Sequence, residues 1–446
     1  MKILCVSLGC DKNLVDSEMM LGLLRRDGYS LTDDETEAEI IVINTCAFID
    51  AAKEESINTI LEMARLKTEG KCRVLVVCGC MAERYKEEVL REIPEVDAIL
   101  GTNSCGAVTS AIERVLAGEK QVTVFRDLED LPEESEERIL TAGGWSSFLK
   151  IAEGCNKRCT YCIIPYLRGP YRSVPILRLI SEAKRLAAQG VKELILVAQE
   201  TTLYGVDLTG KKMLPTLLRK LSEIDGIEWI RLMYCYPEEI DDELIEAVAT
   251  IPKVLHYIDL PIQHASDRIL RLMGRKTTQS ELREKIERIR SRIPDVCLRT
   301  TLISGFPTET EEDHEILMDF VNDMEFDRLG VFTYSREENT PAAEFADQVP
   351  DDIKEERRDE IMELQQEIAF EKAASRIGTR MDVMIEGRIP EEGVYIGRTY
   401  MDAPNVDSQI YLHTDRELIS GSVVRAVITD SVEYDLKGVM EDEFAE

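Results

Sequence analysis

The sequence predicts an α/β protein of three parts: a doubly wound parallel-sheet domain, an incomplete (β/α)6 barrel and a small terminal β-barrel. Three observations predict this order. Apolar, β-branched runs alternate with helical patterns at the start of the chain, six further strand–helix units follow, and the last part contains only short strands. With 446 residues, the chain is long enough to build several buried cores.

The N-terminal domain is expected over residues 1–125. Ile3–Leu8, Ile40–Asn44 and Val74–Cys78 are apolar and β-branched, as parallel strands covered on both faces are. Helical patterns such as Asp16–Arg26 lie between them. This alternation predicts an open parallel sheet with helices on both faces.

The second part is expected over residues 141–350, after an acidic, proline-containing linker at 126–140. Strands and helices again alternate, and six units are too few to close a full barrel. In such a barrel the catalytic groups lie at the C-terminal ends of the strands. The expected strands are Phe148–Ala152, Glu193–Ala198, Trp229–Tyr234, Tyr257–Leu260, Leu298–Ile303 and Leu329–Thr333.

A long charged helix at 351–380 carries an apolar stripe and is expected to connect the barrel to the third part, residues 381–446. There, short alternating strands separated by Gly and Pro predict a small β-barrel. The expected strands are Met381–Ile385, Tyr395–Thr399, Gln409–Leu412 and Ser422–Ile428.

The composition restricts the class of protein and the kind of partner. No apolar run is long enough to span a membrane and the start of the chain lacks a secretory pattern, so a cytoplasmic protein without membrane association is expected. The chain has 54 basic and 86 acidic side chains, a net charge of −32. Such a surface repels polyanions and attracts basic partners.

Twelve cysteines in a large chain without a secretory signal indicate metal or redox chemistry rather than disulfides. Because only four histidines are present, the ligands of any metal should be mainly thiolates.

The strongest local motif is a Cys-x3-Cys-x2-Cys run formed by Cys155, Cys159 and Cys162, directly after an expected strand. Three thiolates on one short loop can hold three corners of a 4Fe–4S cluster and leave one iron open. An open iron can chelate the amino and carboxylate groups of S-adenosylmethionine, whose reductive cleavage gives a 5′-deoxyadenosyl radical. A structural zinc loop is disfavoured, because it normally uses two Cys-x2-Cys pairs.

A second trio, Cys10, Cys46 and Cys80, is dispersed in sequence, but each member follows one of the three expected N-terminal strands. The carboxyl ends of parallel strands meet at one edge of a sheet, so these thiols should converge and could hold a second cluster. Two alternatives stay open at this point: the three are buried as small hydrophobic residues, or Cys78 takes the place of Cys80.

With both trios in view, the chain resembles the radical S-adenosylmethionine methylthiotransferases over nearly its whole length. The resemblance favours Cys80 over Cys78. Two positions depart from the family pattern: Thr308 stands where glycine is usual, and Val174 where arginine is frequent. The motifs that carry the resemblance are Ser7–Glu18 (Ser-Leu-Gly-Cys-Asp-Lys-Asn-Leu-Val-Asp-Ser-Glu), Asn44–Cys46 (Asn-Thr-Cys), Gly79–Tyr85, Asp259–Asp267 and Gly305–Glu309.

The resemblance implies two 4Fe–4S clusters with different tasks, and S-adenosylmethionine as both methyl donor and radical source. Cys155, Cys159 and Cys162 would hold the catalytic cluster that cleaves S-adenosylmethionine. Cys10, Cys46 and Cys80 would hold an auxiliary cluster whose sulfur species is methylated and transferred to a carbon radical of the substrate. It also implies an electron donor such as flavodoxin or ferredoxin, and a TRAM-like terminal barrel.

The family has two main branches, which modify either an aspartate of the twelfth protein of the small ribosomal subunit or an adenosine of transfer RNA. The segment Asp11–Asp16 is similar to the protein-modifying branch. Independently, residues 381–446 carry 15 acidic against 5 basic side chains, which is unsuited to gripping phosphates. Both features favour the basic ribosomal protein over RNA, with transfer-RNA modification as the alternative.

Four further residues are candidates for contact with S-adenosylmethionine. Gln199 and Glu200 end the second barrel strand, Gln263 follows the fourth, and Tyr161 lies inside the cysteine loop. Each is equally interpretable as an ordinary structural group. A different class of protein, an iron–sulfur electron carrier or scaffold without catalysis, also remains open from the residues alone.

Overall fold

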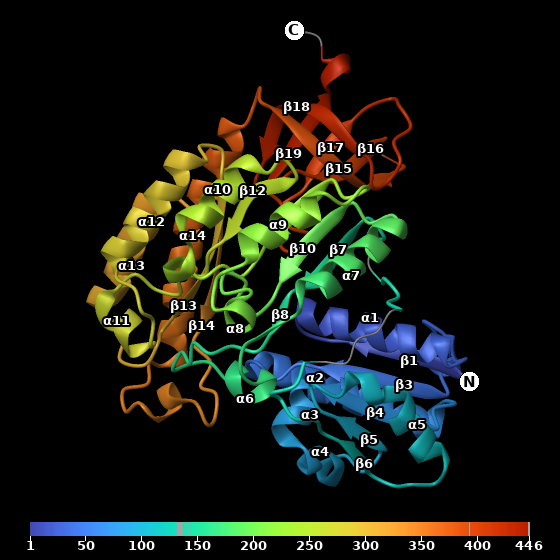
Figure 1. Cartoon of the computed structure of the whole chain (residues 1–446). Coiled ribbons are helices and arrows are strands. Elements are labelled where there is room, and N and C mark those ends of the chain that lie inside the picture. The colour runs from blue at the N-terminus through green and yellow to red at the C-terminus, as the bar shows by residue number, and fades with distance from the viewer. Residues whose placement is uncertain (132–136, 142, 392, 445–446) are drawn as a thin grey trace.

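The computed structural model describes residues 1–131, 137–141, 143–391 and 393–444. Figure 1 shows three parts in chain order, with the first domain at the bottom, the incomplete barrel in the middle and the terminal β-barrel at the top. The predicted fold class is confirmed. In the described ranges, no helix is long and apolar enough to cross a bilayer.

The first domain is a six-stranded parallel sheet of order β2-β1-β3-β4-β5-β6. Met20 and Val108 pack on one face of the sheet, and Ile60 and Met81 on the other, so the sheet is doubly wound. Its strands are β1 (Lys2–Ser7), β2 (Ser30–Leu31), β3 (Ile40–Thr45), β4 (Val74–Gly79), β5 (Ala98–Leu100) and β6 (Val122–Val124). Its helices are α1 (Asp11–Arg26), α2 (Asp50–Glu69), α3 (Cys80–Tyr85), α4 (Glu87–Glu92) and α5 (Val108–Leu116).

The linker expected at 126–140 lies partly outside the described residues. The end of the linker that leads into the second part packs against both neighbouring domains. The buried Arg138 pairs with Glu18 of α1 (2.7 Å) and Glu182 of the second part (3.0 Å).

The second part is a six-stranded parallel sheet of order β14-β13-β12-β11-β10-β7, whose edges β7 and β14 are not paired with each other. All six expected strands are present, as β7 (Ser146–Lys150), β10 (Glu193–Val197), β11 (Trp229–Leu232), β12 (Val254–Asp259), β13 (Cys297–Ser304) and β14 (Arg328–Thr333). The helices are α6 (Ile164–Arg168), α7 (Ile176–Ala188), α8 (Val206–Thr209), α9 (Leu214–Ser222), α10 (Asp242–Thr250), α11 (Asp267–Leu272), α12 (Gln279–Arg292) and α13 (Glu311–Met324). A small antiparallel pair, β8 (Ala152–Glu153) and β9 (Arg172–Ser173), brackets the cysteine loop.

Helix α14 (Asp351–Ser375) leads to a closed barrel of order β15-β16-β17-β19-β18. The strand β19 was not expected from the sequence, because Gly438 interrupts its apolar pattern. A Cβ at Gly438 would lie 2.9 Å from the carbonyl oxygen of Val427, so close strand packing requires this glycine. The strands are β15 (Arg380–Ile389), β16 (Val394–Arg398), β17 (Ile410–His413), β18 (Val423–Val432) and β19 (Asp435–Met440).

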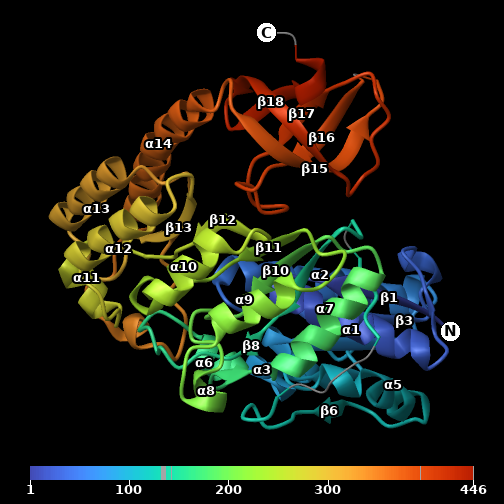
Figure 2. The same ribbon diagram turned by 45° about the horizontal axis from the view of Figure 1, so that its top comes forward.

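The loop that follows β16 reaches the inner face of the incomplete barrel, and Figure 2 shows the terminal barrel above this sheet. Arg231 Nη1 donates to the Tyr400 carbonyl (2.7 Å), and Tyr257 donates its hydroxyl to Asp407 (2.7 Å). Arg328 pairs with Asp402 (2.7 Å). The loop therefore covers the N-terminal end of the barrel interior.

This finding changes the interpretation of the acidic terminal domain. Asp402 and Asp407 are turned into the barrel, and Glu386 accepts hydrogen bonds from Arg398 (2.6 Å) and from the Trp145 indole (2.6 Å). Part of the negative charge thus fastens the domain to the barrel rather than facing solvent.

Candidate active site

The Cys155–Cys162 loop is held by backbone hydrogen bonds to neighbouring segments. Cys155 N donates to the Gly169 carbonyl (3.1 Å) and Thr160 N to the Met273 carbonyl (2.9 Å). Gly154 has φ +76°, and a Cβ there would lie 2.1 Å from the Pro170 carbonyl oxygen. Only glycine fits directly before the first cysteine, where the chain leaves β8.

The thiols of this loop lie in a poorly hydrated environment. Cys155 and Cys159 are buried and Cys162 is partly buried. Burial raises the pKa of Cys155 to about 11 and holds the pKa of Cys162 still higher. A metal centre would have to displace these protons, because thiols bind metals as thiolates.

Cys10, Cys46 and Cys80 follow β1, β3 and β4 at the carboxyl edge of the first sheet. Gly9 and Gly79, which precede Cys10 and Cys80, have φ of +87° and +88°. A Cβ on Gly9 would lie 2.9 Å from the sulfur of Cys46, so the chain around Cys10 packs directly on the second thiol. The two Gly-Cys pairs are therefore structural requirements of this arrangement.

Arg168, at the end of α6, places a buried guanidinium beside this trio. Its Nη2 donates to the side-chain oxygen of Asn13, and Asn13 in turn donates to the Thr45 carbonyl (3.0 Å) next to Cys46. Burial raises the pKa of Cys80 to about 12, and the positive charge of Arg168 opposes that rise. The second part of the chain thus supplies a cation to the cysteine site of the first.

A buried network of charges lies between the two cysteine sites. Arg168 Nη1 donates to Asp16 (3.0 Å) and Glu153 (3.3 Å), and Lys150 contacts the same two carboxylates, Glu153 at 2.9 Å. Burial alone would raise the pKa of Glu153, but Lys150 and Arg168 hold it well below its usual range. Since Glu153 stands two residues before Cys155, the network joins the cysteine loop to α1 of the first domain.

Both trios fit iron–sulfur clusters by their donor chemistry. In the part of the chain that the structure describes, no three His, Cys, Asp or Glu side chains converge closely enough to share a single metal ion. A cubane cluster instead takes each thiolate on a separate iron, so its ligands are spread more widely. Six thiols, arranged as two sets of three, match that requirement better than a mononuclear site.

The four candidate cofactor contacts lie in different environments. Gln199 donates to Glu153 (3.0 Å), and Gln263 occupies a left-handed backbone conformation with φ +72°. The ring of Tyr161 packs edge-on against Phe306, with centroids 6.5 Å apart. Among the described residues, Gln199 Oε1 and Glu200 Oε2 are buried acceptors without a hydrogen-bond donor.

Glu200 is fully buried at the end of β10. Burial raises its pKa to about 7, although Thr202 N donates to one oxygen (2.9 Å) and Lys157 lies 3.8 Å from the other. Perturbed, buried carboxyl groups at strand ends of a barrel are frequent in functional sites.

Sequence reasoning missed the charged residues between the trios: Asp16, Lys150, Glu153 and Arg168. Their pairs join positions up to 152 residues apart, and no periodic pattern reports such contacts. The only available signal was the presence of charged residues within otherwise apolar strand and helix ends, which is too common to be diagnostic.

Comparison with family models divides the chain as the structure does. Residues 2–101 match Uncharacterized protein family UPF0004, residues 149–321 match the Radical SAM superfamily, and residues 377–440 match the TRAM domain. The fold and the two cysteine sites thus define an enzyme of the radical S-adenosylmethionine class.

Curated relatives are similar over the whole chain. "Ribosomal protein uS12 methylthiotransferase RimO" of Lachnoclostridium phytofermentans is 62% identical, over 99% of this chain and 100% of the relative. The enzyme of the same name from Acetivibrio thermocellus is 50% identical, over 98% of each. The chain belongs to the RimO family of methylthiotransferases.

Solved structures share the fold at low identity. The radical S-adenosylmethionine methyltransferase TsrM of Kitasatospora setae, with cobalamin and a [4Fe-4S] cluster bound, is 15% identical with a TM-score of 0.57, over 76% of this chain and 73% of that one. The cobalamin-dependent enzyme OxsB is 12% identical with a TM-score of 0.54, over 82% of this chain and 56% of that one. At this identity the likeness concerns the fold alone.

Proposed function

We propose that this protein methylthiolates the β-carbon of an aspartate in ribosomal protein uS12 by a radical S-adenosylmethionine mechanism. One observation carries the proposal: two separate trios of cysteines lie on two domains that a single buried charge network joins. An electron carrier or scaffold would have no use for a second cluster site with an open iron.

Each trio has its own task in this proposal. Cys155, Cys159 and Cys162 hold the catalytic cluster, and Cys10, Cys46 and Cys80 hold the auxiliary one. When bound, the two clusters and S-adenosylmethionine supply the radical, the sulfur and the methyl group. The first trio forms the Cys-x3-Cys-x2-Cys motif of the barrel, and the second follows the strand ends of the first sheet.

The chain's own side chains orient these groups. Lys150 and Arg168 pair with both Glu153 and Asp16 and so tie the start of the Cys155 loop to α1. Gln199 Oε1, a buried acceptor without a hydrogen-bond donor, and the Glu200 carboxyl, whose Oε2 lies 3.8 Å from Lys157, suit the ammonium or hydroxyl donors of S-adenosylmethionine. Gln263 and Tyr161, whose ring packs on Phe306, complete the proposed contacts.

A basic protein substrate is supported by charge and by the relatives. The net charge of −32 attracts a lysine- and arginine-rich ribosomal protein and disfavours RNA, although part of the acidity of the terminal domain points inward. The relatives that match the whole chain are named for uS12. An electron donor such as flavodoxin or ferredoxin, and a cytoplasmic location, complete the proposal.

The test is anaerobic reconstitution with iron and sulfide, followed by reductant and S-adenosylmethionine. Purified uS12 or unmodified transfer RNA is added in parallel, and products are identified by mass spectrometry. A methylthio group on an aspartate of uS12, with the RNA unchanged, is the expected result. Modification of the RNA alone would refute the protein substrate, and absence of S-adenosylmethionine cleavage would refute the enzyme class.

A further inference from the structure

One buried lysine of the first domain lacks a carboxylate partner. In the described ranges three lysines are buried: Lys12, Lys150 and Lys354. Lys150 pairs with Glu153 (2.9 Å), and Lys354 pairs with a carboxylate on its own helix, α14. Among the described residues no carboxylate forms an ion pair with Lys12, which is 6% exposed. Because burial of an ammonium without an anion costs free energy, the place of Lys12 in the fold needs a reason.

The ammonium of Lys12 lies over an aromatic ring of the barrel. Its Nζ is 3.6 Å from the ring centroid of Tyr234, which follows β11. The face of an aromatic ring attracts a cation. One ring face cannot accept from all three N–H groups of an ammonium, however. The ring of Tyr234 therefore holds Lys12 in place and leaves N–H groups available to a further acceptor.

Tyr234 is itself fixed at the C-terminal end of the barrel strands. Its N–H donates to Asp259 (2.9 Å), the last residue of β12, and its carbonyl accepts from Thr201 N (3.1 Å), shortly after β10. Tyr234 has φ +57°, a left-handed conformation that costs energy in a residue other than glycine. The ring that positions Lys12 thus lies at the face of the barrel where catalytic groups gather.

The two carboxylates that contact Tyr234 already have other donors. Asp11, the neighbour of Lys12 in the chain, accepts the hydroxyl of Tyr234 (3.1 Å). Asp259 pairs with Arg299 (2.9 Å) in addition to accepting the Tyr234 N–H. Neither carboxylate forms an ion pair with Lys12. The positive charge of Lys12 is therefore available to an anion that the surrounding side chains do not supply.

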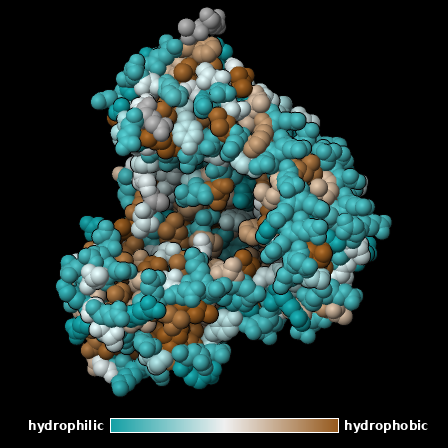
Figure 3. All heavy atoms as spheres, turned by 180° about the vertical axis from the view of Figure 1, so that it is seen from behind, coloured by the Kyte–Doolittle hydropathy of each residue, from teal (hydrophilic) through white to brown (hydrophobic). Residues whose placement is uncertain are grey.

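Lys12 lies between the second cysteine trio and the barrel. It is two residues after Cys10, in the first turn of α1, and its ammonium reaches Tyr234 of the other domain. In the proposed reaction sulfur is joined to the β-carbon of an aspartate, and this carbon is bonded directly to the carboxylate group. An anchor for the carboxylate beside Cys10 therefore brings the acceptor carbon to the auxiliary site. Seen from behind, the molecular surface is hollowed between the parts of the chain, where a substrate segment can enter (Figure 3).

We propose that the Lys12 ammonium binds the side-chain carboxylate of the substrate aspartate and so selects an acidic residue at the modified position. This inference rests on the proposed function and deepens it, because it names the group that recognises the reacting side chain. Asparagine has almost the same size as aspartate but no charge, so it would leave the ammonium buried without an anion. A site built around a polar partner strongly rejects an analogue that lacks this partner.

A double-mutant cycle tests this contact. Dissociation constants are measured for the cluster-loaded enzyme without reductant, with wild type or Lys12→Met on one side. On the other side is uS12 with either aspartate or asparagine at the position that mass spectrometry shows to be modified. Each single change is expected to weaken binding about thirtyfold, the usual effect of removing one partner of a buried charge pair. The second change should add less than about threefold, because the contact is already lost.

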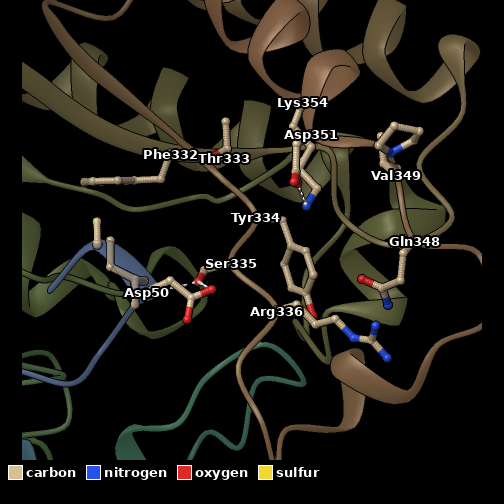
Figure 4. Close-up of a pocket in the computed structure, with 13 residues that line it drawn as sticks. Asp50, Phe332, Thr333, Tyr334, Ser335, Arg336, Gln348, Val349, Asp351 and Lys354 are labelled. Atoms are coloured by element: carbon tan, nitrogen blue, oxygen red, sulfur yellow. Dashed lines mark hydrogen bonds and ion pairs between the residues drawn. The ribbon is translucent and has the colours of Figure 1, made fainter. Parts of the chain in front are cut away.

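Lys354→Met is the matched control. Lys354 is 7% exposed and its ammonium also lies over a ring, that of Tyr334 (5.5 Å from the centroid). It differs from Lys12 in having a carboxylate partner, Asp351 (2.8 Å), beside which Figure 4 shows it in a separate pocket. This variant should change the affinity less than about twofold, equally for both forms of uS12. Lys12→Gln, which keeps the length and polarity of the side chain, should show the same loss of coupling as Lys12→Met.

Additive losses, in which Lys12→Met weakens both forms of uS12 by the same factor, overturn the carboxylate contact. Two further measurements then show what Lys12 does instead. A shifted reduction potential of one cluster assigns the ammonium to the auxiliary cluster, and weaker binding of S-adenosylmethionine assigns it to the carboxylate of that cofactor. Both results leave the proposed function standing. If the wild-type enzyme modifies only RNA, the proposed function itself is refuted, and this inference with it.

Discussion

Replacing Glu193 by glutamine should loosen the attachment of the terminal barrel. The carboxylate of Glu193, on β10, accepts from Arg231 Nε (2.8 Å) and pairs with Arg398 Nη2 (2.6 Å), the last residue of β16. All three side chains are buried. Glutamine keeps the size of the side chain but leaves two buried guanidinium groups facing a neutral amide.

The expected cost is about 3–5 kcal/mol, the usual consequence of removing one partner from a buried ion pair. The pKa of Glu193 leads to a similar value. Burial would raise that pKa, but Arg398 and Arg231 lower it from 4.5 to about 2. Such a fall means that the folded protein stabilises the charged carboxylate relative to the neutral acid by about 3 kcal/mol.

The sign of the pH dependence follows from this depressed pKa. The stabilisation by the Glu193 carboxylate is fully present above about pH 5 and is lost as the pH falls from there towards 2. The free-energy difference between wild type and Glu193→Gln should therefore be large at pH 7 and shrink in acid.

Urea unfolding of the apoprotein at several pH values measures this difference, and limited proteolysis near α14 reports release of the terminal barrel. Glu228→Gln is the matched control, because Glu228, just before β11, pairs with Lys192, just before β10, and both side chains are partly exposed. That variant should cost less than about 1 kcal/mol. Equal stability of the two variants at pH 7, or a difference that does not shrink below pH 4, would refute the reasoning.

Three other predictions concern the cysteine sites and one strained position. Arg168→Met should lower the free energy of unfolding of the apoprotein by about 3–5 kcal/mol, measured in urea, because the two buried carboxylates Asp16 and Glu153 are left with Lys150 as their shared cation; a loss below 1 kcal/mol would contradict the network. Cys10→Ser should bind about four fewer iron atoms after reconstitution, whereas Cys105→Ser, a buried thiol outside both trios, should bind the wild-type amount; equal iron in both would contradict the assignment. Thr308→Gly should raise the melting temperature, with a gain of about 1 kcal/mol, because φ +71° strains a β-branched residue; a lower melting temperature would show that the side-chain contact of Thr308 with Arg268 dominates.

The longer strands, and the position of a cysteine after each of β1, β3 and β4, could be predicted because they depend on local sequence, whereas the short strands β2, β5 and β6 were not expected. Apolar, β-branched runs define β1, β3 and β4, and a cysteine that follows each run must emerge at the same edge of a parallel sheet. The glycines before Cys10 and Cys80 were visible in the sequence. Only the structure shows why glycine is needed there: φ is positive, and a Cβ would contact Cys46 or Asn44.

The parts that escaped prediction depend on contacts between distant segments. The strand β19 contains Gly438 within its apolar pattern, so it is recognised by its pairing with β17 and β18. The charge of residues 381–446 was interpreted as surface acidity, yet Asp402 and Asp407 lie inside the barrel. Departure from the family glycine at Thr308 was visible, whereas the left-handed backbone that explains the glycine was not.

The loop that enters the barrel makes the terminal domain part of the barrel interior. Tyr400, Asp402 and Asp407 form the floor at its N-terminal end, where Tyr400 and Asp402 supply partners to the inward arginines Arg231 and Arg328. Exchange of this domain with that of a related enzyme would therefore remove the floor along with any recognition surface. A chimaera designed to change substrate choice should therefore keep these three residues of the host protein. The contacts between the loop and the barrel then stay intact while the rest of the domain is exchanged.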